Sequence, residues 1–314
     1  MLPTKNEKKL DKWNSLNYYM RNNITHRVTM NKESGYILKS LLKGLEVLQV
    51  ISESENPLGL SEISQKTATN MVRATRILRT FEKAGYLYRD SRKRYNLSPK
   101  MLSLGYAFIN SIEWIDIAQY YMGALYNTVG GIVSLTVLDD VEIVYLSRIR
   151  DKEFISLSIH AGTRLPVHCT AMGKVMLAYS SREEMERILN KIDFNMNKLT
   201  NFTISSREAF VQELSWITQN GYAVNDEELA LGNRAVAAPI LNGQGYAVAA
   251  VCVALQTIQF SREEIEKRIS KSVIACANKI SDDLQKLAMS MNVSMDHFVK
   301  QNKVNWSFNS NASR

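Results

Sequence analysis

The segment at residues 70–84 constrains the fold most, because its apolar and basic residues fall on opposite sides of one helix. Ala74, Ile77, Leu78 and Phe81 follow the i, i+3, i+4, i+7 spacing of a stripe that must face a core. The other side is polar and basic, with one arginine at its edge: Val72, Thr75, Arg76, Arg79, Lys83 and Arg73. We therefore expect a helix that packs on a small domain and presents cations outward.

The neighbouring segments complete that small domain. Residues 40–51 have the apolar spacing of a first helix, through Leu41, Leu42, Leu45, Leu48, Val50 and Ile51. Ser61 is a predicted N-cap for a short second helix that ends near Thr67. Residues 86–89 and 95–97 are expected strands of a hairpin with its turn at 90–93. The order is helix, helix, helix, hairpin.

Positive charge is concentrated in this part of the chain. Residues 1–100 hold 19 Lys and Arg against 9 Asp and Glu, a net charge of +10, whereas residues 101–314 hold 20 against 22, a net charge of −2. Segregation of this kind attracts a polyanion to one end of a molecule. Double-stranded DNA is the expected partner.

A short helix, a turn and a second helix with a basic outer face suit the major groove of DNA. We expect base contacts near the start of the third helix and phosphate contacts from its later part and from the hairpin tip. The predicted DNA-binding residues are Ser61, Thr69, Asn70, Arg73, Thr75, Arg76, Arg79, Arg92, Lys93 and Arg94. The alternative is a solvated cationic face.

The rest of the chain predicts a second, larger α/β domain. Helices are expected at about 100–112 and 115–129, and later near 170–190, 206–220 and 261–287. Expected strands are 132–138, 142–149, 154–160, 234–241 and 246–255. The natural architecture is an α+β fold with an antiparallel sheet flanked by helices. We expect a flexible extension at 1–35, a DNA-binding domain at 36–98, a linker helix at 99–114, the second domain at 115–288 and a flexible tail at 289–314.

Residues 162–174, GTRLPVHCTAMGK, run from a loop into a helix whose first residues are small. Exposed backbone N–H groups at such a helix start bind carboxylates or phosphates, so a small organic acid is a reasonable ligand. The spacing differs from a phosphate-binding GxxxxGK[ST] loop. A glycine-tightened helix entry without a ligand remains the alternative.

Two catalytic interpretations are alternatives to this binding role. His168 lies beside Cys169 and could activate its thiol, but adjacent side chains point apart and no third orienting group is evident. The acidic run at 226–228 lacks metal-ligand spacing and fits a pocket rim or a turn better. Cys169, Cys252 and Cys276 form no CxxC pair and are expected to be buried and reduced. We expect no catalytic residues, no metal and no cofactor.

The chain is expected in the cytoplasm. Its longest apolar run, residues 247–255, is far shorter than the ~18 residues that a membrane span needs. Its first residues do not resemble a secretory signal.

Over residues 40–286 the sequence resembles the IclR family of bacterial transcription regulators. The similar blocks in the first domain are SLLKGLEVLQVI, LGLSEIS, RILRTFEKAGYL and RYNLSPKMLSLG, and in the second IVYLSRI, GTRLPVHCTAMGK, GYAVNDEELALGNRAVAAPI and YAVAAVCVAL. The resemblance implies a winged helix-turn-helix, a linker helix that dimerises, and a GAF-like effector domain that binds organic acids. It also implies homodimers, commonly tetramers, on partly palindromic operators.

By the same resemblance, the ligand would lie near Ala171, Met172 and Gly173 in the effector domain. The opposite wall would be formed by Asn225, Glu228, Asn233 and Ala235. IVYLSRI and LALGNR look most like the branch that controls protocatechuate, hydroxybenzoate and β-ketoadipate catabolism. The run TATNMVR departs from the family's usual recognition helix, and Asn233 stands where an apolar residue is frequent, so neither operator nor effector can be carried over.

The sequence thus favours a DNA-binding regulator, repressor or activator, of a catabolic operon controlled by a small organic acid, aromatic acids included. One alternative is an enzyme that converts a small acid through His168 and Cys169, with an accessory basic domain. Another is a nucleoid-type DNA binder without a sensor, whose binding would respond to salt but to no ligand.

Overall fold

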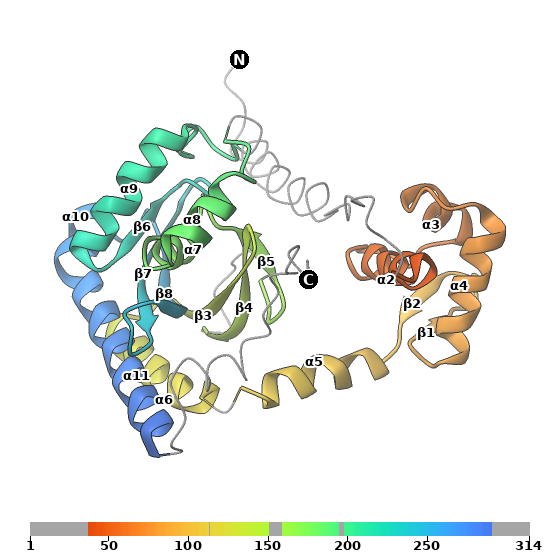
Figure 1. The fold of residues 1–314 in the computed structure, drawn as a ribbon, viewed down its shortest axis with the longest axis horizontal. Helices are drawn as coiled ribbons and strands as arrows, with labels where there is room; N and C mark the ends of the chain where they lie inside the picture. The colour runs from red at the N-terminus through yellow and green to blue at the C-terminus, as the bar shows by residue number, and fades with distance from the viewer. Residues whose placement is uncertain (1–36, 113, 151–158, 195–197, 291–314) are drawn as a thin grey trace, which may run out of the picture. The chain divides into compact units, whose positions relative to one another are not determined.

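The structure, a computed structural model, describes residues 37–112, 114–150, 159–194 and 198–290 (Figure 1). The chain divides into two compact units between residues 111 and 112. Most of the two terminal segments expected to be flexible, 1–35 and 289–314, lies outside the described residues. The two units are considered separately below.

Within the described residues, the N-terminal unit is built from four helices and one hairpin. Its elements are α2 (Lys39–Ser52), α3 (Leu60–Lys66), α4 (Met71–Lys83), β1 (Leu87–Arg89), β2 (Tyr95–Leu97) and α5 (Lys100–Asn110). Leu87 pairs with Leu97 in the antiparallel hairpin. Val47, Ile63, Leu78 and Leu87 meet in one buried cluster, so three helices and the hairpin share a core. The predicted order of helix, helix, helix, hairpin is confirmed.

The first helix lies where the spacing predicts it, but one local prediction in this unit is wrong. In α2, Gly44 and Val47 face inward and Leu41 and Leu45 are exposed; a side-chain carbon at Gly44 would lie 3.3 Å from the ring of Phe81. In α3, Ser61 is not the N-cap. The cap is Gly59, whose N–H donates to Glu62 Oε2 at 2.7 Å, so the helix begins one residue before the serine.

In the part of the C-terminal unit that the structure describes, the centre is a six-stranded antiparallel sheet. Its strands are β3 (Ile132–Asp139), β4 (Glu142–Ile149), β5 (Arg164–Pro166), β6 (Ala223–Asp226), β7 (Asn233–Leu241) and β8 (Ala247–Gln256). They lie in the order β5-β4-β3-β8-β7-β6. Ser134 of β3 pairs with Arg148 of β4 and with Cys252 of β8, which in turn pairs with Ala237 of β7. The long central strands therefore carry one continuous row of side chains across the sheet.

Helices cover both faces of this sheet (Figure 1). One layer contains α7 (Ala171–Ala178), with α8 (Arg182–Leu189) and α9 (Arg207–Asn220) next to it. The other contains α6 (Ile115–Val129) and α11 (Ser270–Ser290), which follows α10 (Arg262–Glu264) and a π-helical turn at Ile265–Ile269. The predicted α+β architecture, an antiparallel sheet flanked by helices, is confirmed.

Differences of detail concern short elements. The single helix expected at 170–190 is two helices, since Ser181 caps a new start by accepting the N–H of Glu184. Strands β5 and β6 were not predicted. The strand expected at 154–160 falls mostly outside the described residues, and Ile159 and His160 are not in a strand. Within the described part of the chain, no helix is long and apolar enough to cross a membrane.

Candidate nucleic-acid interface and effector site

Helix α4 is held by its cap and its apolar stripe, which leaves its basic side exposed. Asn70 is the N-cap, and its Oδ1 accepts the N–H of Arg73 at 2.8 Å. Ala74 and Leu78 are fully buried. Three guanidinium groups on the outer side are exposed and form no ion pair with any described residue: Arg73, Arg76 and Arg79. Exposed arginines on a rigid helix can bond base edges and phosphates.

The turn before α4 is less accessible to solvent than the sequence predicted. Thr69 is buried, and its hydroxyl donates to the carbonyl of Thr67 at 3.1 Å. Lys43 of α2 donates to the same carbonyl at 2.7 Å. Thr69 therefore holds the turn between the two helices, and its side chain cannot reach a base from this conformation.

The structure gives Thr75 and Val72 on α4 different roles from those that the sequence predicted. The hydroxyl of Thr75 donates to the carbonyl of Met71 at 2.7 Å, so its proton is already used within the helix. Met71 and Val72 are exposed, Val72 by 73%. Apolar side chains of this size can contact a thymine methyl group in the major groove. The outward position of Val72 was predicted, but its apolar character was not used as a signal.

The three cationic residues at the hairpin tip do not all have the same role. Asp90 Oδ1 accepts the N–H groups of Arg92 at 2.9 Å and Arg94 at 2.8 Å, which fixes the turn. Arg94 Nη1 donates to the carbonyl of Pro57 at 2.7 Å and lies 3.5 Å from Glu62 Oε2. Arg94 thus ties the hairpin to the start of α3 through one guanidinium nitrogen. Arg92 and Lys93 remain exposed.

The structure therefore keeps seven of the ten predicted DNA-contacting positions exposed, all within the N-terminal unit: Ser61, Asn70, Arg73, Arg76, Arg79, Arg92 and Lys93. Thr69 is buried, and Thr75 and Arg94 are half-buried with bonds inside the unit.

In the C-terminal unit, the predicted ligand residues gather around the start of α7. Ala171, Met172 and Gly173 form its first turn. Asn225 on β6 donates through Nδ2 to the carbonyl of Cys169, and its Oδ1 accepts the N–H of Glu228 at 3.1 Å. Ala235 on β7 pairs with Asn225. Asn233 lies two residues earlier on β7, on the same side of the strand as Ala235.

A buried lysine that was missing from the predicted set joins these elements. Lys174 on α7 is 1% exposed, and its Nζ donates to Glu228 Oε1 at 2.6 Å, to the carbonyl of Val224 at 2.7 Å and to Glu213 Oε1 at 3.0 Å. Glu228 Oε2 is buried without a hydrogen-bond partner. Burial raises the pKa of the Glu228 carboxyl, and Lys174 opposes that rise. A buried carboxylate oxygen without a donor is a place where a ligand could bind.

Gly173 has a packing role that the ligand-binding prediction did not include. A side-chain carbon at this position would lie 2.3 Å from both Cα and O of Val167. The first turn of α7 therefore lies directly on the backbone of the preceding loop, which only glycine permits. A large residue at this position would disturb the fold itself.

We accordingly expect Gly173→Ala to destabilise the C-terminal unit by about 1–3 kcal/mol, the cost of overpacking a filled site. Chemical denaturation followed by the fluorescence of Trp114 and Trp216 measures it. Gly123→Ala, on α6 where a side-chain carbon meets nothing within 4 Å, is the matched control. Equal stability of the two variants would contradict the packing role of Gly173.

The buried pair His168–Cys169 does not have the environment of a nucleophile. Burial raises the pKa of the Cys169 thiol well above its ordinary value, which disfavours the reactive thiolate. The His168 ring packs edge-on against Phe194 with ring centres 6.2 Å apart. Cys169, Cys252 and Cys276 are all buried and unbridged, as predicted. No cluster of three or more metal-ligating side chains occurs among the described residues.

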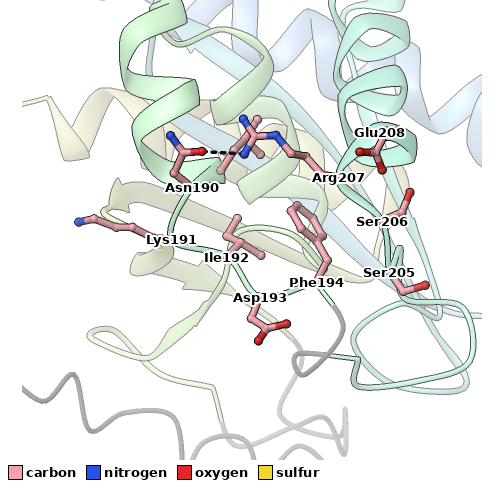
Figure 2. Close-up of a pocket in the computed structure, with 10 residues that line it drawn as sticks. Asn190, Lys191, Ile192, Asp193, Phe194, Ser205, Ser206, Arg207 and Glu208 are labelled. Carbon is pink, nitrogen blue, oxygen red and sulfur yellow. Dashed lines mark hydrogen bonds between the residues drawn. The ribbon is translucent and has the colours of Figure 1, made fainter.

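A separate open hollow of 590 Å³ lies between the end of α8 and the start of α9 (Figure 2). It is lined by residues 189–194 and 205–208, and Arg207 donates to Asn190 Oδ1 across it at 2.8 Å. None of the seven predicted ligand residues lines it.

Comparison with known proteins identifies the family of both units. Residues 106–282 match the family described as "Bacterial transcriptional regulator IclR C-terminal", and residues 40–91 match the "IclR helix-turn-helix domain". The chain therefore belongs to the IclR family of bacterial transcription regulators, which are DNA-binding proteins and not enzymes.

Several curated relatives have about the same sequence identity to this chain. The regulator KdgR of Dickeya chrysanthemi is 29% identical over 275 residues, 85% of this chain and 88% of its own. The Pca regulon regulatory protein of Pseudomonas putida is 29% identical over 248 residues, covering 79% and 84%. The p-hydroxybenzoate hydroxylase transcriptional activator of Acinetobacter baylyi is 29% identical over 225 residues, covering 70% and 82%. The hydroxybenzoate and protocatechuate branch is thus among the relatives, at the same identity as KdgR.

Solved structures confirm the fold. The Thermotoga maritima IclR matches with a TM-score of 0.62 at 27% identity, covering 78% of this chain and 98% of that one. An IclR homolog from Microbacterium hydrocarbonoxydans complexed with 4-hydroxybenzoate matches with a TM-score of 0.67 at 22% identity, covering 79% and 99%.

Proposed function

We propose that this chain is a homodimeric regulator of a catabolic operon whose affinity for its operator is set by a small organic acid. The observation that carries the DNA-binding half is the outer side of α4, where Arg73, Arg76 and Arg79 are exposed and lack carboxylate partners among the described residues. In this proposal residues 36–98 bind DNA, residues 99–114 connect, and residues 115–288 bind the effector. Because its target is chromosomal DNA, the regulator acts in the cytoplasm.

The dimer is proposed to form through α5. This helix, KMLSLGYAFIN, is mostly apolar, yet none of its residues is buried within the chain. Leu102 is 75% exposed and Tyr106 is 63% exposed, and Leu104 is exposed on the same helix. An apolar helix without a partner gains free energy by burying that surface. A second copy of α5 is the occupant that suits a regulator bound to two operator half-sites.

The effector is proposed to bind at the first turn of α7, facing β6 and β7. Gly173 and Lys174 donate their N–H groups to Thr170, so the N–H groups in this turn that remain available to an acceptor atom of the ligand are those of Ala171 and Met172. Glu228 Oε2, buried and without a donor, would take a hydroxyl or amide hydrogen of the ligand. Asn225 fixes the loop between these walls.

Effector and operator are then coupled by differential binding. The acid changes operator affinity only as far as it binds the DNA-competent and DNA-incompetent dimers differently. A coupling free energy of about 1–3 kcal/mol corresponds to a roughly 5- to 150-fold change in operator affinity.

Fluorescence anisotropy with an operator selected in vitro by the full chain tests this function. The probes are 4-hydroxybenzoate, protocatechuate and pyruvate at millimolar concentration. We expect sequence-specific binding by a dimer and a change in affinity with at least one acid. Binding that depends on salt alone, with no preference for sequence, would contradict the proposal.

A further inference from the structure

The face of the sheet that α7 covers carries one cationic side chain on β4. Arg148 pairs with Ser134, and Ser134 pairs with Cys252. Side chains of directly paired residues point to the same face of a sheet. Cys252 belongs to the buried cluster that also contains Cys169 and Met172 at the start of α7. The Arg148 side chain is therefore on the effector side of the sheet.

Other cations that are at least half-buried in this unit have carboxylate partners. Arg164 pairs with Glu142, Lys174 with Glu228, and Arg234 with Asp226, each at 2.7 Å or less. Arg187 pairs with Asp140 and Arg207 with Glu186. Partly buried charges are retained in proteins when an opposite charge and hydrogen bonds offset the loss of water.

Arg148 departs from this pattern among the described residues. It is half-buried and forms no ion pair with them, and one guanidinium nitrogen donates to the carbonyl of Ile159. Its Nε is buried and has no acceptor. The guanidinium carbon lies 5.8 Å from the centre of the Tyr145 ring. Burial lowers the pKa of Arg148, as expected for a cation that has lost water without gaining an anion.

A second unsatisfied polar atom lies on the same face. Thr136 is 0% exposed, and its Oγ1 has no hydrogen-bond partner. Thr136 is two residues after Ser134 on β3 and pairs with Tyr145, whose ring Arg148 approaches. A hydroxyl both donates and accepts, so it can bond a carboxylate oxygen that also receives an N–H of Arg148. One anionic group bound between these neighbouring strands would give a partner to both atoms.

We propose that Arg148, with Thr136 on the neighbouring strand and the same face of the sheet, binds the carboxylate of the effector and so determines that the ligand is an acid. This inference rests on the proposed effector site and adds the wall formed by β3 and β4. The guanidinium supplies the positive charge that Lys174 cannot, since Glu213 and Glu228 already engage that lysine. The ligand class is a small carboxylic acid, and a neutral amide of the same shape is excluded.

The test compares Arg148→Gln with Arg150→Gln, which removes the same charge from an exposed position two residues further along. Binding of 4-hydroxybenzoate, protocatechuate and pyruvate to the full-length protein is measured by calorimetry, together with the neutral amide of whichever acid binds best. We expect Arg148→Gln to weaken acid binding roughly ten- to hundredfold, the effect of a lost charge-assisted hydrogen bond. Arg150→Gln should bind as the unsubstituted chain does, and the amide should not bind.

Three results would overturn the inference: unchanged acid binding by Arg148→Gln, amide binding equal to acid binding, or no binding of any of these acids to the unsubstituted chain. If Arg148→Gln does not fold, Arg148→Lys keeps the charge but loses the fork of donors, and its acid affinity should fall by a smaller factor; no fall in that variant would also overturn it. Operator binding without acid is measured in parallel. Its retention separates failure of this inference from failure of the regulator function.

Discussion

Lys174→Met is expected to destabilise the C-terminal unit by about 3–5 kcal/mol, the usual loss when one partner of a buried ion pair is removed. The ammonium group is 1% exposed and has three oxygen acceptors within 3.0 Å. Without it, Glu228 would be a buried carboxylate with neither oxygen paired by a side chain. The free energy of unfolding, measured by denaturation with the fluorescence of Trp114 and Trp216, reports the change.

The pH dependence of this variant follows from the same contacts. Burial raises the pKa of Glu228, and Lys174 counteracts part of that rise, so losing the lysine raises the pKa further. A carboxyl whose pKa is higher in the folded than in the unfolded protein favours folding when it is protonated. The deficit of Lys174→Met should therefore be largest at neutral pH and shrink as the pH falls.

Two controls separate the ion pair from side-chain packing. Adding Glu228→Gln to Lys174→Met removes the uncompensated charge and should recover much of the lost stability. Lys271→Met changes an exposed lysine on α11 and should alter stability by no more than about 0.5 kcal/mol. A single variant as stable as the unsubstituted chain, or a double variant no better than the single one at neutral pH, would contradict the account.

Arg73→Ala combined with Arg76→Ala is expected to weaken binding to the selected operator by about 2–6 kcal/mol, from 1–3 kcal/mol for each lost base contact. Both side chains are exposed on α4, and neither is needed for the buried stripe formed by Ala74 and Leu78. The folded unit should therefore keep its stability. Anisotropy with operator and with scrambled DNA shows whether the loss is specific.

Matched variants distinguish base reading from general attraction. Arg92→Gln with Lys93→Gln should weaken operator and scrambled DNA alike and reduce the slope of affinity against salt by about one for each lost phosphate contact. Arg182→Ala, an exposed arginine on α8, should change neither. If the α4 variant loses the same factor on both DNAs, those arginines do not read sequence.

Sequence periodicity predicted α4 well because the evidence for it is local. Ala74, Ile77, Leu78 and Phe81 all contact the core as the spacing required. The spacing also predicted the α2 helix but did not indicate which of its sides is buried, because its apolar residues occupy several sides of the helix. There the buried side is selected by the contact between Gly44 and Phe81, which are 37 positions apart and not related by any local pattern.

The roles of single side chains were less predictable for the same reason. Arg94 resembled its neighbours Arg92 and Lys93 in sequence, but its acceptor is the carbonyl of Pro57, 37 residues away. Lys174 ends the sequence block GTRLPVHCTAMGK, but its hydrogen-bond acceptors lie 39 to 54 residues further along the chain, so its role could not be read from that block. Strands β5 and β6 have three and four residues, too few to show a period of two.

The effector site was predicted in part from the sequence. Family resemblance pointed to the first turn of α7 and to Asn225 and Glu228, which the structure brings together around Cys169 and Lys174. Gly173 was included as a ligand residue, but its contact with the backbone of Val167 explains the glycine without a ligand. Arg148 was absent from the prediction, because only strand pairing places it on the face that α7 covers.

Photo-cross-linking from the outer side of α4 tests most directly whether this helix enters the groove of DNA. Val72→p-benzoylphenylalanine places the reactive group on that side, and Trp216→p-benzoylphenylalanine places it on α9 of the other unit. Position 72 should cross-link to the bases of the selected operator, and position 216 should not. Protein that still binds the operator but gives no cross-link from position 72 would contradict the assignment of α4 as the recognition helix.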